Sequence, residues 1–435
     1  MASDNMKKTE WYLDFVDLKY RPKDEDLLVL FRVEPASDIS MEEAIGRVAS
    51  ESSIGTWTTL TTMSPEKRRL MAKVYEIDGP WVKVAYPADL FESGNMPQVL
   101  SSIAGNVFGM KAVKNLRLED VRWPKELIKS FKGPLLGIKG IKKIFKVEER
   151  PLTATVPKPK VGMTSEEHAQ AGYDAWVGGL NLLKDDENLS GQIFNQFERR
   201  ARKSFEMRNK AERETGEKKS YLINVTAETK EMLRRANFVK ELGGEYVMVD
   251  ILTAGWAGVQ SLRDECEDLK LAIHAHRAFH AAFTRKKEHG MSMLAVAKVA
   301  RLVGVDQIHI GTVIGKLEAT KEEVLTLEDE ITKDVVEGNE HILPQDWYGI
   351  KPTFPVTSGG LHPGLIPEII DLLGKNVVIQ VGGGVWGHPA GGKAGAMAVR
   401  QAIDAALEGI SLDEYAKTKK ELKGALEKWG YTRPK

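Results

Sequence analysis

The sequence predicts an α/β protein with an N-terminal α+β domain of the ferredoxin-like type over residues 1–140 and a C-terminal (β/α)₈ TIM barrel, with C-terminal helices, over residues 141–435. After residue 150, short apolar runs alternate with amphipathic helical stretches, a rhythm typical of parallel βα units. Eight such runs can be distinguished, and the roughly 250 residues that an eight-stranded barrel needs are available.

The N-terminal domain is predicted from a mixture of strand and helix patterns. Two runs, residues 27–36 and 81–91, have the composition of strands. Residues 40–52 and 96–109 have the apolar spacing of helices, and Ser40 is a suitable N-cap for the first of them. The combination indicates a small α+β sandwich.

The barrel is predicted from its eight strands and from the polar residues at their ends. The strands are expected at residues 152–160, 179–187, 220–228, 246–255, 271–278, 306–315, 353–361 and 377–387. Six of them end in side chains or glycines that a buried strand avoids: Lys158 and Lys160; Lys184, Asp186 and Glu187; His274, His276 and Arg277; His309; Ser358; and Gly382 to Gly384. Because active sites of such barrels form at the carboxyl ends of the strands, we expect these residues to converge on one rim.

Composition excludes several classes of protein. Lysine plus arginine equals aspartate plus glutamate at 62 each, so no global charge favours nucleic acid or an anionic membrane, and a small anionic ligand fits better. Cys266 is the single cysteine, which excludes an intrachain disulfide. Without a long apolar segment or a signal-like N-terminus, we expect a cytoplasmic protein.

The end of the second strand is open to two interpretations. Lys184 stands beside Asp185, Asp186 and Glu187, which fits a solvated strand end with a helix cap. The acids also fit a site for a hard metal ion, but an ammonium offers a metal no lone pair. Strand alternation turns Asp185 away from Lys184 and Asp186, whereas Glu187 lies where the strand ends and can turn back, so we do not expect Asp185 to bind a metal.

The other motifs also allow alternatives. Lys158 and Lys160 share a strand face and need an anion, or they flank a solvated proline turn. His274 and His276 can bind zinc, pack in the core, or act as acid or base. The glycine runs at residues 358–364 and 381–389 form either a phosphate cradle or two flexible turns. Lys316, on a loop with glycine hinges, can close over a ligand or remain solvated.

Taken together and in this order, the motifs resemble the large chain of ribulose-1,5-bisphosphate carboxylase/oxygenase (RuBisCO). The resemblance runs from "ESSIGTWTT" and "AGNVFGMKA" through "PKPKVG", "KDDEN", "HAHRAFHAAFTR" and "IHIGTVIGKLE" to "SGGLHPG" and "GGGVWGHP". The "TVPKPK" and "AGW" segments are closer to the archaeal form III branch than to the plant branch.

This resemblance implies a metal site and a set of catalytic residues. Lys184 would take up CO₂ as a carbamate, and the carbamate, Asp186 and Glu187 would hold Mg²⁺. Lys158 matches the proton-transferring lysine, His276 the histidine that assists hydration, and Lys316 the loop lysine that reaches the new carboxylate. Matching substrate-binding residues are Lys160, Arg277, His309, Ser358, Gly359, Gly360, Gln380, Gly382 and Gly383, with Glu51, Thr56, Trp57 and Asn106 lent to the barrel of a neighbouring chain.

The implied reaction adds CO₂ and water to ribulose 1,5-bisphosphate to give two molecules of 3-phosphoglycerate, with O₂ as a competing substrate. The resemblance further implies a homodimer with shared active sites, a decamer of dimers as a larger assembly, no small subunit, and a role in archaeal degradation of AMP and other nucleoside monophosphates. Two rival hypotheses are a RuBisCO-like enolase for another phosphorylated ketose and a non-catalytic phosphosugar-binding subunit.

Three residues depart from the family pattern. Asn181 stands where aspartate is expected, Val156 where the plant pattern has threonine, and Ile310 where serine or threonine is usual. None of them is a metal ligand or proton carrier in the family scheme. We therefore expect them to affect rate and CO₂/O₂ discrimination rather than the class of reaction.

Overall fold

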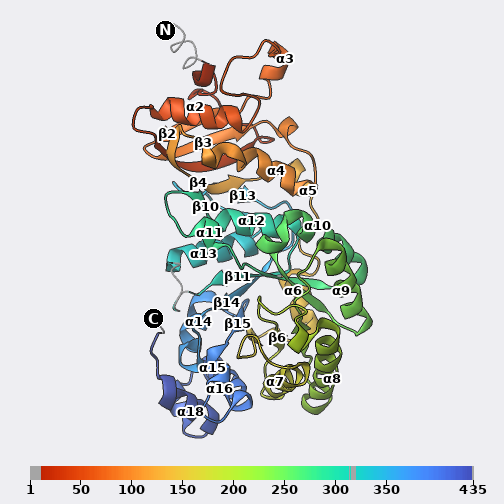
Figure 1. Cartoon of the computed structure of the whole chain (residues 1–435). Helices are drawn as coiled ribbons and strands as arrows, with labels where there is room; N and C mark the ends of the chain where they lie inside the picture. The colour runs from red at the N-terminus through yellow and green to blue at the C-terminus, as the bar shows by residue number, and fades with distance from the viewer. Residues whose placement is uncertain (1–10, 313, 315–319, 434–435) are drawn as a thin grey trace. The chain divides into compact units, whose positions relative to one another are not determined.

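The computed structural model describes residues 11–312, 314 and 320–433, and these residues form two compact units that are interleaved along the chain (Figure 1). Unit 1 consists of Met1–Lys132, Phe279–Val303 and Lys333–Ile350. Unit 2 consists of Gly133–Ala278, Gly304–Thr332 and Lys351–Lys435. Each unit has a sheet of its own.

Unit 1 is built on a five-stranded sheet with the order β10-β4-β1-β3-β2. The strands are β1 (Leu27–Pro35), β2 (Lys73–Asp78), β3 (Trp81–Tyr86), β4 (Val113–Arg122) and β10 (Gly290–Met291). All neighbours are antiparallel except β10, which runs parallel to β4. Its helices are α2 (Met41–Glu51), α3 (Pro65–Arg68), α4 (Met96–Ile103), α5 (Lys125–Lys129), α11 (Ala281–Thr284) and α12 (Met293–Val303), and β12 (Val335–Val336) pairs with β13 (Gln345–Asp346).

The predicted elements of this unit are confirmed at β1, β3 and α2. Ser40 caps α2, since its hydroxyl accepts a hydrogen bond from the backbone N–H of Glu43 at 3.1 Å. The expected helix over residues 96–109 is wrong in its second half, where α4 ends and a 3₁₀ turn covers Asn106–Gly109. Strands β2 and β4 were not predicted.

Unit 2 contains an eight-stranded parallel sheet with the order β7-β6-β5-β15-β14-β11-β9-β8. A parallel bridge between Asn224 and Met248 joins the two ends of this order, so the sheet closes into a barrel. The strands are β5 (Leu152–Thr155), β6 (Leu182–Lys184), β7 (Ser220–Leu222), β8 (Tyr246–Asp250), β9 (Ala272–His276), β11 (Gln307–Gly311), β14 (Phe354–Ser358) and β15 (Val378–Gln380). The eight predicted strands and the barrel are therefore confirmed.

Helices surround these strands (Figure 1). They are α6 (Gly137–Phe145), α7 (Ser165–Val177), α8 (Phe197–Thr215), α9 (Thr229–Glu241), α10 (Ile251–Leu269), α13 (Lys321–Thr332), α14 (Ile366–Leu373), α15 (Gly383–Trp386), α16 (Gly392–Glu408), α17 (Leu412–Ala416) and α18 (Lys420–Trp429). Helix α7 begins with a capping box between Thr164 and Glu167. No helix among the described residues is long and apolar enough to cross a membrane.

The barrel interior explains why polar side chains meet at its mouth. Inward positions near the start of the strands, such as Leu152, Leu182 and Phe354, are buried and pack together with Ile141 and Phe145 of α6. Side chains on a strand alternate between the two faces of the sheet, so every second residue toward the carboxyl end of each strand also points into the barrel. This alternation puts six polar side chains on the inner side of the barrel at the carboxyl ends of the strands: Lys184, His274, His276, His309, Ser358 and Gln380.

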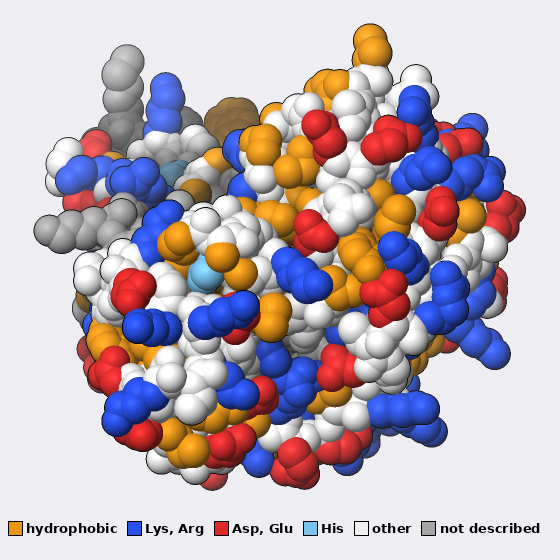
Figure 2. Space-filling view, turned by 90° about the horizontal axis from the view of Figure 1, so that it is seen from below, with side chains coloured by type: hydrophobic (Ala, Val, Ile, Leu, Met, Phe, Trp, Pro, Cys, Tyr) orange, Lys and Arg blue, Asp and Glu red, His pale blue; other side chains and the backbone are white. Residues whose placement is uncertain are grey.

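The strands are shorter than predicted, and one inference from their length is wrong. Strand β5 ends at Thr155, so Lys158 and Lys160 lie in the following loop and strand alternation does not orient them. Acidic and basic side chains are interspersed across the face drawn in Figure 2, in keeping with the equal totals of 62 in the sequence.

Candidate active site

Lys184 is the last residue of β6 and is almost completely enclosed, with 1% of its surface exposed. Its Nζ donates a hydrogen bond to the backbone oxygen of Asp185 at 2.7 Å. Burial lowers the pKa of this lysine, and the nearby carboxylates of Glu187, Asp250 and Asp186 offset only part of that effect. At a given pH, a larger fraction of Lys184 is therefore in the neutral amine form than is the case for an exposed lysine.

Asp186 lies beside Lys158, whose Nζ is 2.9 Å from Oδ2 of the carboxylate. Asn188 donates to the other oxygen from its backbone and its side-chain amide, at 3.2 and 3.0 Å. Burial alone would raise the pKa of Asp186, but the hydrogen bonds from Lys158 and Asn188 outweigh it and hold the pKa below its usual value. Asp186 is therefore an ionised oxygen donor at the site.

Glu187 and His276 face each other from neighbouring parts of the rim, with Oε2 of the glutamate 3.6 Å from Nε2 of the ring. The other ring nitrogen, Nδ1, is 3.1 Å from Oδ1 of Asp250. Burial, reinforced by the charge of Lys184, lowers the pKa of His276 to about 3. Burial likewise raises the pKa of Asp250 to about 6. The neutral ring is therefore hydrogen-bonded to Asp250 through Nδ1, whereas Glu187 is a close neighbour of Nε2 beyond hydrogen-bond distance.

A chain of hydrogen bonds crosses the barrel mouth. Nδ1 of His274 is 2.9 Å from Oε1 of Gln307, and Nε2 of His274 is 3.0 Å from Nε2 of His309. Nδ1 of His309 then lies 2.8 Å from the hydroxyl of Ser358. Burial lowers the pKa of His274 and His309 well below the usual range, so both rings are neutral. His274 is thus a core histidine, and His276 alone of the pair reaches the acids.

The glycine runs lie at the ends of β14 and β15. Gly359 and Gly360 have φ values of +116° and +76°, a backbone conformation that side chains disfavour. A Cβ atom on Gly382 would lie 3.7 Å from Cε of Lys158, which places this run beside the proton-carrier candidate. Buried Gln380, whose Oε1 has no hydrogen-bond partner among the described residues, precedes the run. Arg277 is also buried, and burial lowers its pKa to about 10.

The remaining predicted site residues lie in the loop after β5, in unit 1, or outside the residues that the structure describes. Lys160 is exposed in the loop after β5, and Lys316 falls outside the described residues. Glu51, Thr56 and Trp57 line a cavity of about 170 Å³ in unit 1. Nδ2 of Asn106 donates to Oε1 of Glu51 at 3.2 Å, and Trp57 is 70% exposed. The predicted group of four is thus found within unit 1.

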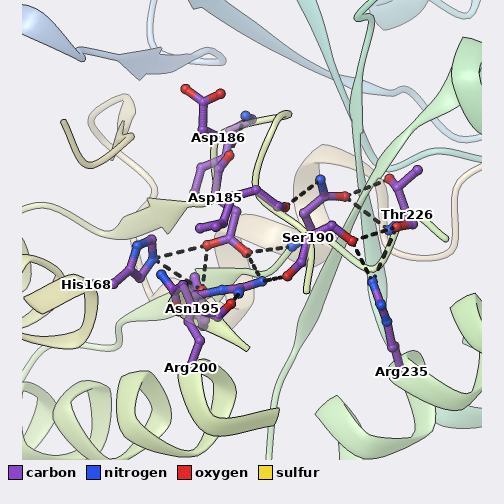
Figure 3. A network of polar contacts seen from close by, with 12 residues as sticks. His168, Asp185, Asp186, Ser190, Asn195, Arg200, Thr226 and Arg235 are labelled. Carbon is purple, nitrogen blue, oxygen red and sulfur yellow. Dashed lines mark hydrogen bonds and ion pairs between the residues drawn. The ribbon is translucent and has the colours of Figure 1, made fainter. Parts of the chain in front are cut away.

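Asp185, the residue after β6, faces away from the carboxylate of Asp186, as expected, into a buried network (Figure 3). Its carboxylate accepts from the hydroxyl of Tyr221 at 2.5 Å and from the backbone N–H of Asn224 at 3.0 Å. His168 and Arg200 lie 3.1 and 3.2 Å away. Burial would raise its pKa, but Arg200 and the hydrogen bonds hold the pKa well below the usual range.

Sequence reasoning missed Asp250 and Asn224. Asp250 ends β8, and its carboxylate contacts His276 and lies 3.4 Å from the amide nitrogen of Asn224. That amide also donates to the backbone oxygen of Leu189 at 3.1 Å. The position of Asp250 at the carboxyl end of a barrel strand was a usable signal, because it matches the placement of the other site residues.

The three departures from the family pattern lie in strands or loops and are buried. Oδ1 of Asn181, three residues before Lys184, accepts from Arg150, from the backbone N–H of Thr153 and from its hydroxyl, at 2.9, 3.2 and 3.1 Å. Val156 and Ile310 are buried apolar side chains. Asn181 thus ties β5 to β6 below the site.

A comparison with protein families matches residues 14–127 to the ribulose bisphosphate carboxylase large chain, N-terminal domain, and residues 137–429 to the catalytic domain. The ribulose bisphosphate carboxylase of Pyrococcus abyssi is 54% identical over 98% of this chain and 99% of that protein. The dimeric archaeal RuBisCO from Hyperthermus butylicus superimposes with a TM-score of 0.92 at 50% identity, over 97% of this chain and all (100%) of that one.

The octameric enzyme from Pyrococcus horikoshii superimposes with a TM-score of 0.89 at 53% identity, over 97% of this chain and 99% of that one. These relatives cover 97–98% of the chain and are archaeal, which confirms the resemblance inferred from the motifs. The chain belongs to the ribulose bisphosphate carboxylase large-chain family, and to its archaeal members.

Proposed function

We propose that the chain is a ribulose bisphosphate carboxylase, which joins CO₂ and water to ribulose 1,5-bisphosphate to form two molecules of 3-phosphoglycerate and accepts O₂ as a competing substrate. The observation that carries the proposal is the buried amine of Lys184 among the carboxylates at the end of β6. A buried lysine with a lowered pKa is a usable nucleophile toward CO₂, because the neutral amine is the reactive form.

The side chains fit the carbamate and magnesium that the family implies. Among the described residues, no group of three or more histidine, cysteine, aspartate or glutamate side chains could hold a metal ion, so Asp186 and Glu187 alone are a ligand short. A carbamate on Lys184 would complete three anionic oxygen donors, the type that Mg²⁺ prefers. Bound there, Mg²⁺ would stabilise negative charge that develops on substrate oxygens.

The proton-transfer roles that we assign follow from the contacts. Lys158 holds its ammonium at the site and is partly exposed, so it can deliver a proton to the substrate and recover one from solvent. His276 is neutral and bonded to Asp250 through Nδ1, which leaves Nε2 toward Glu187. We assign His276 to proton exchange with the water that hydrates the substrate.

The phosphate-binding role rests on the ends of three strands. Backbone N–H groups of Gly359, Gly360, Gly382 and Gly383 suit anionic oxygens, and we assign them to phosphate. Arg277, His309, Ser358, Gln380 and Lys160 are proposed to contact the phosphates or hydroxyls. Lys316 is proposed to reach the new carboxylate.

We further propose a homodimer in which unit 1 of one chain completes the barrel site of the other. Exposed Trp57, with Thr56, and the bonded pair of Glu51 and Asn106 would be the contributed residues. The dimeric and octameric archaeal relatives support an even-numbered assembly. A decamer of dimers, the independence from a small subunit and a role in AMP degradation remain predictions. The last is testable by following ribose carbon of labelled AMP into phosphoglycerate in cell extract.

One assay tests the activity. The protein is incubated anaerobically with labelled bicarbonate, Mg²⁺ and ribulose 1,5-bisphosphate, and labelled 3-phosphoglycerate is measured. We expect fixation by the wild type, none by Lys184→Met, and wild-type fixation by the control Lys203→Met, whose side chain is 45% exposed on α8. Consumption of the substrate without label would favour the enolase instead, and binding without consumption would favour the non-catalytic subunit.

A further inference from the structure

Helix α18 and the residues after it contact the loops that follow β14 and β15. The ring of Trp429, the last residue of α18, lies 5.8 Å from that of His362 at an interplanar angle of 27°, and 6.5 Å from that of His388 at 60°. His362 follows Gly360 by two positions, and His388 follows Gly383 by five. One indole therefore touches both of the loops that we assign to phosphate.

Hydrogen bonds secure the same contacts. Nε2 of His362 donates to the backbone oxygen of Thr432 at 2.8 Å, and Nε2 of His388 donates to that of Glu421 at 2.8 Å. Because a carbonyl oxygen can only accept, both rings carry their proton on Nε2. Nζ of Lys428 also donates to the backbone oxygen of Gly387 at 2.5 Å.

The packing leaves little room for the loops to shift. A Cβ atom on Gly364 would collide with the backbone oxygen of Gly430, and one on Gly384 would collide with that of Leu361. A Cβ on Gly387 would lie 3.3 Å from Cζ2 of Trp429. The two loops thus pack against each other as well as against the segment that ends in α18, and movement of one is transmitted to the other.

From these contacts we propose that Trp429 is a positioning residue, which holds both glycine-rich loops in the conformation that binds the two-phosphate substrate. The inference rests on the proposed function, because that function assigns the loops to phosphate. Trp429 would act through His362 and His388 rather than by touching substrate. Replacement of Trp429 would therefore change the affinity for substrate more than the rate of the chemical step or the activation of Lys184.

The test compares Trp429→Ala, Trp429→Phe and the control Tyr415→Ala in the full-length protein. Tyr415 is an aromatic residue on the neighbouring α17 whose ring contact is with Lys419. We expect Trp429→Ala to raise the KM for ribulose bisphosphate by about 3- to 10-fold, since an aromatic pair contributes about 0.5–1.5 kcal/mol, with kcat changed less than twofold. Trp429→Phe should recover most of the affinity, and Tyr415→Ala should leave KM unchanged.

A second measurement separates this inference from the proposed function. Calorimetric titration with ribulose bisphosphate, and with inorganic phosphate, reports affinity whether or not CO₂ is fixed. An unchanged affinity in folded Trp429→Ala overturns the inference. A Trp429→Ala variant whose KM and kcat change by similar factors, with neither restored in Trp429→Phe, also overturns it. Should Trp429→Ala not fold, Trp429→Leu keeps an apolar side chain and removes the ring contacts with His362 and His388. Unaltered affinity in Trp429→Leu also overturns the inference.

Discussion

Nζ of Lys158 lies 2.9 Å from Oδ2 of Asp186, and the pair joins the loop after β5 to the end of β6. The lysine is 37% exposed and the aspartate 3%, so one partner reaches solvent while the other is enclosed. Lys158, the proposed proton carrier, is thus held next to Asp186, a candidate metal ligand.

Replacement of Lys158 by arginine should separate charge from proton transfer. Lys158→Arg keeps a cation beside Asp186, but a guanidinium does not release its proton near neutral pH. We expect kcat for carboxylation to fall by about 10²- to 10⁴-fold, with a melting temperature close to that of the wild type. Retention of the wild-type kcat in this variant would remove Lys158 from the mechanism.

Asp185→Asn should destabilise the barrel unit. The substitution leaves Arg200 without its buried counter-charge, and breaking such a pair costs about 3–5 kcal/mol of the free energy of unfolding. Because the folded pKa of Asp185 is below its unfolded value, this stabilisation is present above about pH 4 and is lost as the pH falls below it. Urea unfolding at pH 7 and pH 3 measures both effects.

The matched control for that experiment is Asp371→Asn, at an exposed carboxylate on α14. It should change the free energy of unfolding by less than about 0.5 kcal/mol. An Asp185→Asn variant as stable as this control would show that the network in Figure 3 contributes little.

Asp250→Asn should stabilise the metal-free protein while reducing its activity. The pKa of Asp250 is raised to about 6, so its ionisation costs free energy of folding that grows as the pH rises from about 4 to above 6. At pH 8 the cost is roughly 2–3 kcal/mol, as about two pKa units imply. Unfolding at pH 8 and pH 4 should show a gain only at pH 8, and a loss of stability at pH 8 would contradict the pKa assignment.

Bicarbonate and Mg²⁺ together should raise the melting temperature of the wild type. A ligand that binds only the folded state at 100 times its dissociation constant adds about 2.7 kcal/mol. Lys184→Met and Asp186→Asn should lose the shift, Lys203→Met should keep it, and EDTA should reverse it. If Mg²⁺ alone gave the full shift in Lys184→Met, the carbamate would not be a ligand.

Mixing two inactive variants tests the shared site. In a dimer of Glu51→Gln with Lys184→Met, one site carries both substitutions and the other carries neither. Random pairing of equal amounts should therefore restore about a quarter of the wild-type activity. No recovery after co-refolding, with heterodimers verified by native mass spectrometry, would mean that each chain completes its own site.

Much of the barrel could be predicted from the sequence, because its strands are continuous apolar runs whose polar ends are abrupt. Lys184 and His276 could be placed for the same reason. Strand β4 could not, since its pattern is interrupted by buried charges such as Arg117 and Asp120. Their partners, the backbone oxygen of Thr284 and the ammonium of Lys298, are more than 160 residues away in the sequence.

The loop lysines show a different limit. Alternation holds only where residues are in a strand, and β5 stops at Thr155, three residues before Lys158. Lys158 is oriented by its ion pair with Asp186, a contact between segments that no local pattern encodes. Asp250 was missed because its strand-end position alone does not reveal its contact with His276, which lies on the neighbouring strand β9.

The hydrogen bonds that link Gln307, His274, His309 and Ser358 all run in one direction, with each donor pointing toward Gln307. Oε1 of Gln307 can only accept, so His274 carries its proton on Nδ1 and offers a lone pair at Nε2. His309 must then donate from its own Nε2, which leaves Nδ1 to accept from the hydroxyl of Ser358. The hydrogen of Ser358 is committed inward and its lone pairs remain for an incoming donor. An amide deep in the barrel thus decides that Ser358 receives, rather than gives, a hydrogen bond at the mouth.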